Sequence, residues 1–169
     1  LQPPPGAWPN AGPEETQQVA PAALVTQLRQ VVILVRDLDE AIHRWTTLFD
    51  LKIANRFRTS YGDLDAAILP FGKTGTFVEL AKPANPNSAA ARYLKRFEEQ
   101  GLDAGLYVTI FETPDLDATE RAIRTQGEAE ITQRSDDGSM LRSLWLHPRS
   151  MKDVFLQFTQ VLTPDNPWP

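Results

Sequence analysis

VVILVRDLD, at residues 31–39, is an apolar run that ends in Asp-Leu-Asp, and the chain repeats it as TIFETPDLD at residues 109–117. The two stretches begin at residues 31 and 109, so the offset between them is 109 − 31 = 78 residues. The same offset carries Pro70 onto Pro148 and Phe77 onto Phe155 without a gap. A period kept in step over about fifty positions is the signature of an internal duplication. We therefore expect two copies of one structural module, with a site shared between them.

The first copy predicts the order β-α-β-β-β. Residues 28–35 are rich in β-branched side chains and predict a buried strand. Asp37, three residues before Glu40, is typical of a helix N-cap. The helix that follows is expected to place an apolar stripe against the sheet, formed by Ala41, Ile42, Trp45, Leu48 and Phe49. Three further strands are expected at residues 52–59, 64–70 and 76–81.

The second copy predicts the same order. A strand at residues 106–112 precedes a helix over residues 116–126, and Gly127 stands at the position where a glycine ends a helix. Strands are expected near residues 130–134, 141–147 and 154–161. Between the copies, Ser88 can cap a connecting helix that runs to about residue 100.

These elements predict one α+β domain over residues 27–163. It divides into module one (27–84), a linking helix region (85–101) and module two (102–163), and each module supplies half of a cup-shaped cavity. Residues 1–26 form a proline-rich arm, and residues 164–169 form a C-terminal tail.

Composition narrows the function classes. The chain has 169 residues, of which 41% are hydrophobic and 23% charged, as in ordinary globular proteins. The net charge of −5 comes from interspersed charges without a basic stripe, which argues against a nucleic-acid partner. No apolar run approaches the roughly 20 residues of a membrane span, and the absence of cysteine excludes disulfides and thiolate metal sites. We expect a cytoplasmic location; a removed export signal stays an open alternative because the chain begins with Leu1. A homodimer is compatible with the sequence.

Four short motifs carry a family resemblance. These are ILPFG at residues 68–72, FVEL at 77–80, LHP at 146–148 and VFLQ at 154–157. With the paired β-α-β-β-β modules and the strand that leads into DLDEAI, they resemble the vicinal-oxygen-chelate superfamily, which includes glyoxalase I, extradiol dioxygenases and antibiotic-binding resistance proteins. Within it, the chain is most similar to the methylmalonyl-CoA epimerase branch.

The resemblance implies where a divalent ion would bind. In metal-dependent members, the first and last strands of each copy supply one ligand each, and the matching positions here are Gln30, Glu79, Val108 and Gln157. The 78-residue offset pairs Gln30 with Val108 and Glu79 with Gln157. Only Glu79 is a strong ligand, because valine donates nothing and neutral amides bind transition ions weakly. We therefore expect no tightly bound cofactor or metal.

Strand alternation predicts the face that these residues share. One face of the sheet should carry the candidate ligand-binding residues Gln30, Val32, Leu34, Phe77, Val108, Ile110, Phe155 and Gln157, together with Glu79. Such a mostly apolar site with a few polar groups suits a moderately hydrophobic small molecule. The alternative is that Gln30, Glu79 and Gln157 only hydrogen-bond one another inside a vestigial cavity.

Three charged or titratable sets remain. A carboxylate among apolar walls has a raised pKa, so Glu79 is the candidate general acid or base. Arg56 and Arg58 alternate onto one face of a strand and are candidate ligands for a carboxylate or phosphate, with a solvated basic face as the alternative. His43 is expected on the exposed side of its helix and His147 in a turn.

Two main functions follow from this site. The first is a metal-independent enzyme with isomerase, epimerase or lyase chemistry on a small carbonyl or acyl-CoA-like molecule. The second is a non-catalytic protein that binds or sequesters a small molecule, as antibiotic-resistance members do. A scaffold subunit is a third alternative, and the sequence does not separate them.

Overall fold

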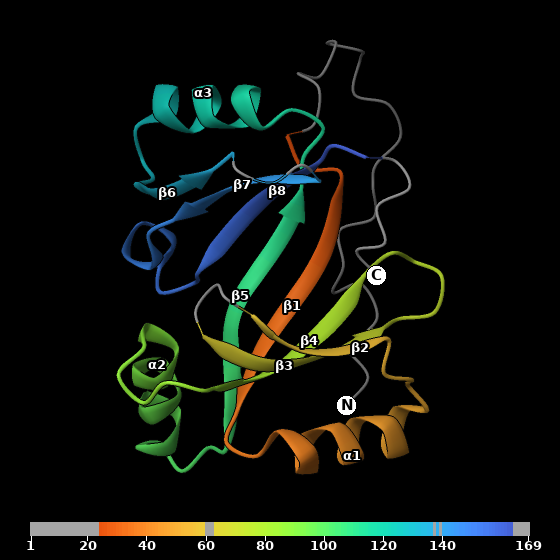
Figure 1. Cartoon of the computed structure of the whole chain (residues 1–169). Coiled ribbons are helices and arrows are strands. Elements are labelled where there is room, and N and C mark those ends of the chain that lie inside the picture. Colours follow the sequence, from red (N-terminus) through yellow and green to blue (C-terminus); the bar gives the residue numbers. More distant parts are fainter. Residues whose placement is uncertain (1–23, 60–62, 137, 139, 164–169) are drawn as a thin grey trace, which may run out of the picture.

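The computed structural model describes residues 24–59, 63–136, 138 and 140–163 (Figure 1). The expected proline-rich arm and C-terminal tail lie outside the described residues, except for residues 24–26 of the arm. In chain order the elements are β1 (Gln27–Val35), α1 (Leu38–Phe49), β2 (Asn55–Thr59), β3 (Leu64–Pro70), β4 (Phe77–Pro83), α2 (Ala89–Glu98), β5 (Ala104–Glu112), α3 (Leu116–Gln126), β6 (Ile131–Ser135), β7 (Leu141–Leu146), the short 3₁₀ helix η1 (Pro148–Met151) and β8 (Leu156–Val161). The expected α+β class and the repeated β-α-β-β-β order are confirmed.

The eight strands form one continuous sheet in the order β2-β3-β4-β1-β5-β8-β7-β6. The two modules join edge to edge because β1 and β5 pair antiparallel, and Val31 faces Thr109. These two residues differ by the 78-residue offset. On either side of them, Gln30 faces Ile110 and Val32 faces Val108, so the pairing is exchanged by the same offset. The pseudo-twofold axis of the duplication therefore passes between Val31 and Thr109.

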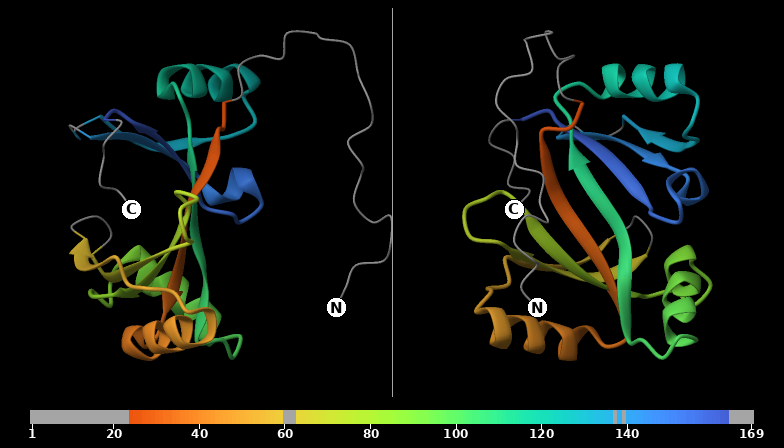
Figure 2. Two further views of the ribbon diagram at one scale, coloured as in Figure 1. Left: turned by 90° about the vertical axis from the view of Figure 1, so that its right-hand side faces the viewer. Right: turned by 180° about the vertical axis from the view of Figure 1, so that it is seen from behind.

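The sheet is strongly bent about its centre. In the left view of Figure 2, the wing made of β2 and β3 and the wing made of β6, β7 and β8 project to the same side of β1 and β5, while α1 and α3 lie on the outer sides of the wings. We call the side between the wings the inner face. This shape agrees with the expected cup.

Alternating side chains explain why the helices sit outside. On the outer face, α1 packs on a buried apolar cluster that includes Val78 and Leu80. Likewise α3 packs on Leu144 and Leu146. Ala90 and Leu94 of α2 instead pack with inner-face residues such as Val32 and Leu34, so α2 covers one end of the inner face.

The helix starts follow the expected capping chemistry. Asp37 accepts a hydrogen bond from the Glu40 backbone N–H at 3.0 Å, and its counterpart Asp115 accepts one from Ala118 at 2.9 Å. Both contacts satisfy backbone donors that have no partner within the helix. At the other end of α3, Gly127 has φ 71°, the left-handed conformation that favours glycine.

The apolar stripe of α1 is shorter than expected. Leu38 and Ile42 are buried and Trp45 is partly buried, but Leu48 is 68% exposed and Phe49 60% exposed. The Phe49 ring contacts the Trp45 ring at a centroid distance of 5.3 Å, with the two rings tilted by 60°. The last turn of the stripe is therefore exposed to solvent. Among the described residues, no helix is long and apolar enough to cross a membrane.

Candidate functional site

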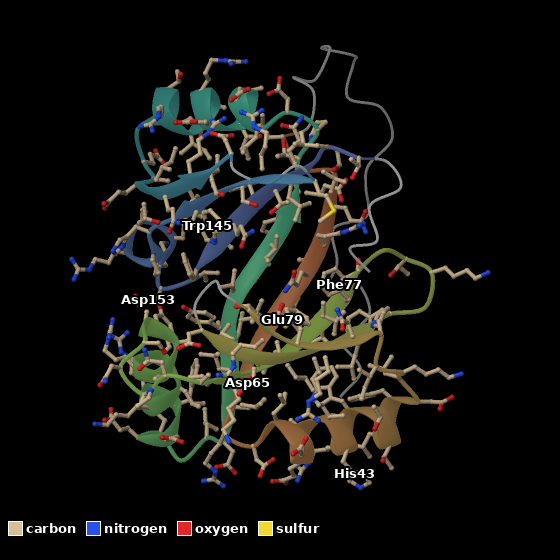
Figure 3. All side chains as sticks on the ribbon, in the orientation of Figure 1. His43, Asp65, Phe77, Glu79, Trp145 and Asp153 are labelled. Atoms are coloured by element: carbon tan, nitrogen blue, oxygen red, sulfur yellow. The ribbon has the colours of Figure 1, made fainter. Side chains whose placement is uncertain are left out.

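Glu79 and Gln30 form the polar pair of module one. Both side chains are on the inner face and almost completely buried, with 7% of Glu79 and 3% of Gln30 exposed. The register places Gln30 beside Phe77 and Val32 beside Glu79, so the pair is diagonal between β1 and β4. Gln30 Nε2 donates a hydrogen bond to Glu79 Oε2. Figure 3 shows Glu79 near the centre of the sheet, between the two wings.

Burial changes the protonation of Glu79. Loss of hydration disfavours its charged form and raises its pKa from 4.5 to about 7, and the hydrogen bond from Gln30 opposes this shift only in part. Gln30 Oε1 is buried and has no hydrogen-bond partner among the described residues. A buried acceptor of this kind requires an unseen donor, which a ligand or a water can provide.

Gln157 occupies the position in module two that corresponds to Glu79. Its Nε2 donates to Ser143 Oγ at 3.2 Å and to Thr159 Oγ1 at 3.0 Å, and these two hydroxyl oxygens are 2.9 Å apart. We call these three residues the hydroxyl triangle. Gln157 is not hydrogen-bonded to Gln30 or Glu79. Of the alternative in which all three bind one another, the structure therefore contains only the contact between Gln30 and Glu79.

An apolar strip separates the two polar groups. Val32, Val108 and Ile110 are buried on β1 and β5 and belong to one cluster with Leu34. Phe77 is also fully buried, next to Gln30 in the register. The structure therefore brings the predicted inner-face residues together on one surface.

Phe155 lies at the end of that strip, in an aromatic group that the sequence did not reveal. The Tyr107 ring contacts the Phe155 ring at 5.7 Å and the Tyr93 ring at 5.3 Å, both edge to face. Tyr107 is the extra residue where the pairing shifts between Val32–Val108 and Ile33–Leu106. Such a bulge turns a side chain to a different face, which strand alternation alone does not predict.

Two further inner-face residues were missed. Ser143 and Trp145 are buried on β7, where they pair with Thr159 and Gln157. The alternation of residues 141–147 contains this signal, but it becomes useful only once the register to β8 is known. Figure 3 shows Trp145 on the wing opposite Asp65, in the upper part of the molecule.

Arg56 and Arg58 are not brought to this site. They pair with Ala67 and Asp65 in the register and lie on the outer face, whereas Phe57 between them packs on the inner face. Arg56 binds Asp39 at 2.7 Å, and Arg58 binds both oxygens of Asp65 at 2.8 Å. Their charges are thus already paired on the far side of the sheet from Glu79.

The two histidines lie outside the inner-face site. His43 is exposed on α1 at the edge of the molecule (Figure 3). His147 caps η1, where its Nδ1 accepts a hydrogen bond from the Arg149 backbone N–H at 3.1 Å. Both placements agree with the sequence expectations.

The donor set on the inner face does not suit a tightly bound transition-metal ion. Of the four positions implied by the resemblance, Val108 offers no donor atom, and Gln30 and Gln157 offer only neutral amide oxygens, which bind transition ions weakly. Glu79 is the single carboxylate. In the part of the chain that the structure describes, no three His, Cys, Asp or Glu side chains gather where they could hold a metal.

Solved structures with the same fold were found. A methylmalonyl-CoA epimerase from Mycobacterium tuberculosis superposes with a TM-score of 0.73 at 22% identity, covering 86% of this chain and 95% of that one. A variant of the Streptomyces coelicolor methylmalonyl-CoA epimerase, in complex with 2-nitronate-propionyl-CoA, gives a TM-score of 0.70 at 21% identity, covering 82% and 99%. A methylmalonyl-CoA epimerase in complex with methylmalonyl-CoA and NH4+ gives 0.71 at 21%, covering 85% and 99%. At these identities the likeness shows the fold alone.

The family is shown by the sequence. No curated protein sequence matches the chain. The family model of the glyoxalase/bleomycin resistance protein/dioxygenase superfamily matches residues 29–141, which is more than half of the chain. Together with the paired modules and the bent eight-stranded sheet, this match places the protein in the glyoxalase/bleomycin resistance protein/dioxygenase superfamily.

Proposed function

We propose that the protein is an epimerase-like enzyme that moves a proton on a small, moderately hydrophobic carbonyl or acyl-CoA-like molecule without a tightly bound metal. The observation that carries this proposal is Glu79, a single carboxyl group buried on the inner face with a pKa of about 7. A group with this pKa is present in both protonation states near neutral pH, so it can both take and return a proton.

Glu79 is the group of this chain that moves the proton. Ionised Glu79 removes the proton α to the carbonyl, and the electron pair of the broken C–H bond passes to the carbonyl oxygen as an enolate. Return of a proton to the carbon, from the Glu79 carboxylic acid or from water, restores the carbonyl. Gln30 holds Glu79 through the hydrogen bond to Oε2, and the surrounding apolar side chains keep bulk water away from the carboxyl group.

The similar solved structures support the choice of substrate class. Two of them hold an acyl-CoA or an acyl-CoA analogue, and the inner face here combines apolar residues with few polar groups. A non-catalytic binding protein is the second candidate, and the apolar strip of Val32, Val108 and Ile110 supports it equally, because apolar burial alone gives affinity.

Exchange of the substrate's α-proton for deuterium distinguishes the enzyme from the non-catalytic binding protein. Chelator-treated protein with verified metal content is incubated in D2O with methylmalonyl-CoA or 2-methylbutyryl-CoA, and deuterium at the α-carbon is followed by mass spectrometry. We expect exchange that increases with pH through about 7 and falls by about 100-fold or more in Glu79→Gln. The exposed residue Glu128 provides the matched control, and Glu128→Gln should exchange as fast as the unchanged protein.

Two outcomes contradict the proposed mechanism. Exchange that Glu79→Gln retains in full would remove Glu79 from the mechanism, and exchange that requires an added divalent ion would remove metal independence. Saturable binding of a compound that is returned unchanged, with no exchange, would establish the binding protein instead.

A further inference from the structure

The hydroxyl triangle fixes the orientation of the Gln157 amide. The Nε2 group has two hydrogens, and both are used by Ser143 Oγ and Thr159 Oγ1. The reverse orientation would require both hydroxyls to donate to Oε1. No proton would then lie between the two hydroxyl oxygens, which are only 2.9 Å apart. The Gln157 nitrogen therefore points into module two and its carbonyl oxygen points away from the triangle.

The same proton count identifies one free donor. Thr159 is fully buried, and its hydroxyl has no acceptor among the described residues other than Ser143. If Ser143 donated to Thr159, the proton left over would lie on the fully buried Thr159, where neither water nor a ligand can reach it, whereas Ser143 is 7% exposed. Thr159 therefore donates to Ser143, and the Ser143 proton is left over.

Two polar atoms thus remain unused on this wing. Gln157 Oε1 accepts no hydrogen bond from a residue that the structure describes, and Gln157 is only partly buried. Trp145 lies beside Gln157 in the register and adds an apolar wall. One acceptor and one donor next to each other match a group that both donates and accepts.

We propose that Gln157 and Ser143 form a subsite for an uncharged hydrogen-bonding group of the ligand, a hydroxyl or an amide. A hydroxyl can donate to Gln157 Oε1 and accept from Ser143. A carboxylate can use only Ser143 and is repelled by the Gln157 carbonyl oxygen. This subsite rests on the proposed function only for the placement of the ligand's carbonyl end at Glu79.

The register sets the length of the ligand. Gln30, which is bonded to Glu79, pairs with Ile110, and Ile110 pairs with Gln157. Two strand spacings therefore separate the Cα atoms of Gln30 and Gln157, at most about 10 Å because the sheet bends toward this face. A short aliphatic chain over Val108 and Ile110 can join the two polar ends.

Two series of S-methyl thioesters test this subsite. One series carries a terminal hydroxyl and the other a terminal methyl, on acyl chains of about three to six carbons, and NMR titrations give the dissociation constants. At one chain length or more, we expect the hydroxyl compound to bind about 5–10-fold more tightly than its methyl partner. A terminal carboxylate at that length should bind more weakly than the hydroxyl.

Substitutions at Gln157 and Ser143 test whether these two side chains cause the preference for the hydroxyl compound. Gln157→Met, which keeps the volume without a hydrogen-bonding group, should remove the hydroxyl preference, and Ser143→Ala should reduce it. Gln126→Met, at the exposed end of α3, is the matched control and should leave it unchanged. Equal binding of the two series, or no binding of either, overturns the subsite, as does a preference that survives both Gln157→Met and Ser143→Ala.

The assay is independent of turnover. Hydroxyl preference without α-proton exchange would keep this subsite and overturn the proposed enzyme. Exchange without hydroxyl preference would keep the enzyme and overturn the subsite.

Discussion

The inner faces of the two modules differ in charge although the duplication places their residues at equivalent points. Module one presents a buried carboxyl group, Glu79, and one amide that binds it. Module two presents Gln157 at the Glu79 position, and its partners are the neutral hydroxyls of Ser143 and Thr159. The comparison teaches that the two halves of the inner face differ chemically, with a titratable carboxyl group in one and neutral hydrogen bonding in the other.

On the outer faces, the contact between helix and sheet is rich in charged groups in module two, whereas in module one it is mainly apolar. In module one, α1 joins a cluster of seven buried apolar residues, to which it contributes Leu38 and Ile42 and the sheet contributes residues such as Ala67 and Leu69. In module two, only three residues of the α3 cluster are buried, and an ion network ties the helix to β6 and β7. Arg134 binds Asp117 at 2.5 Å, Asp136 at 2.7 Å and Glu120, and Arg142 binds Asp117 at 2.9 Å and Asp136 at 2.6 Å. These two arginines lower the pKa of Asp136 to about 2.

The largest effect of the difference between the two modules is expected in the pH dependence of the free energy of unfolding, because the buried carboxyl group of Glu79 in module one has a neutral amide as its counterpart in module two. Burial raises the pKa of Glu79 in the folded protein from 4.5 to about 7, so its contribution to stability is fully present below about pH 4.5 and is lost as the pH rises through about 7. We expect the free energy of unfolding to fall by about 3 kcal/mol over this range relative to Glu79→Gln.

Urea denaturation at a series of pH values measures this difference. Glu128→Gln, an exposed substitution of the same kind, should follow the unchanged protein. Parallel pH profiles for the unchanged protein and Glu79→Gln would show that folding does not change the pKa of Glu79.

Metal binding should return when the ligand types are restored across both modules. In the double variant Gln30→His and Val108→His, two imidazoles replace an amide and an isopropyl group on either side of the pseudo-twofold axis. We expect the affinity for Co2+ or Zn2+ to rise by about 100-fold or more, measured by titration and by the visible absorption of Co2+.

Adding Glu79→Gln to that double variant should abolish most of the gain, which makes it the internal control. Equal metal affinity of the unchanged protein and the double variant would refute the claim that these two positions limit binding.

The smallest effect is expected from the ion network of module two. Arg134→Met should lower the unfolding midpoint by about 3 °C, because a partly buried cation that binds three carboxylates is removed. High salt should reduce this difference. Arg44→Met, which removes an exposed pair with Glu40, should change the midpoint by less than about 1 °C in the same calorimetric scan. Equal effects of the two substitutions would mean that the network adds nothing beyond an ordinary surface pair.

Most of the candidate site on module one was predictable because it depends on strand alternation. Gln30, Val32, Phe77 and Glu79 share a face for the same local reason that successive side chains of a strand alternate. Arg56 and Arg58 were correctly expected to share a face with each other. That this face is the outer one depends on the pairing with β3, which residue types alone do not specify.

The remaining site residues depended on contacts between distant segments. Ser143 became a partner of Gln157 through the register of β7 on β8, and Tyr107 reached the aromatic group through a bulge in the pairing of β5 with β1. The exposure of Leu48 and Phe49 is likewise a property of the folded chain that the apolar stripe alone does not reveal.

The sequence by itself determined the duplication, the helix caps and the residue types at the four positions that the family resemblance marks, because these are properties of residue identity and local spacing. Only the tertiary structure decided that β1 and β5 join the modules with Val31 against Thr109. It also decided that Gln157 turns its amide nitrogen to the hydroxyls of Ser143 and Thr159. Those features are set by hydrogen bonds and packing between residues far apart in the chain, which no local pattern encodes.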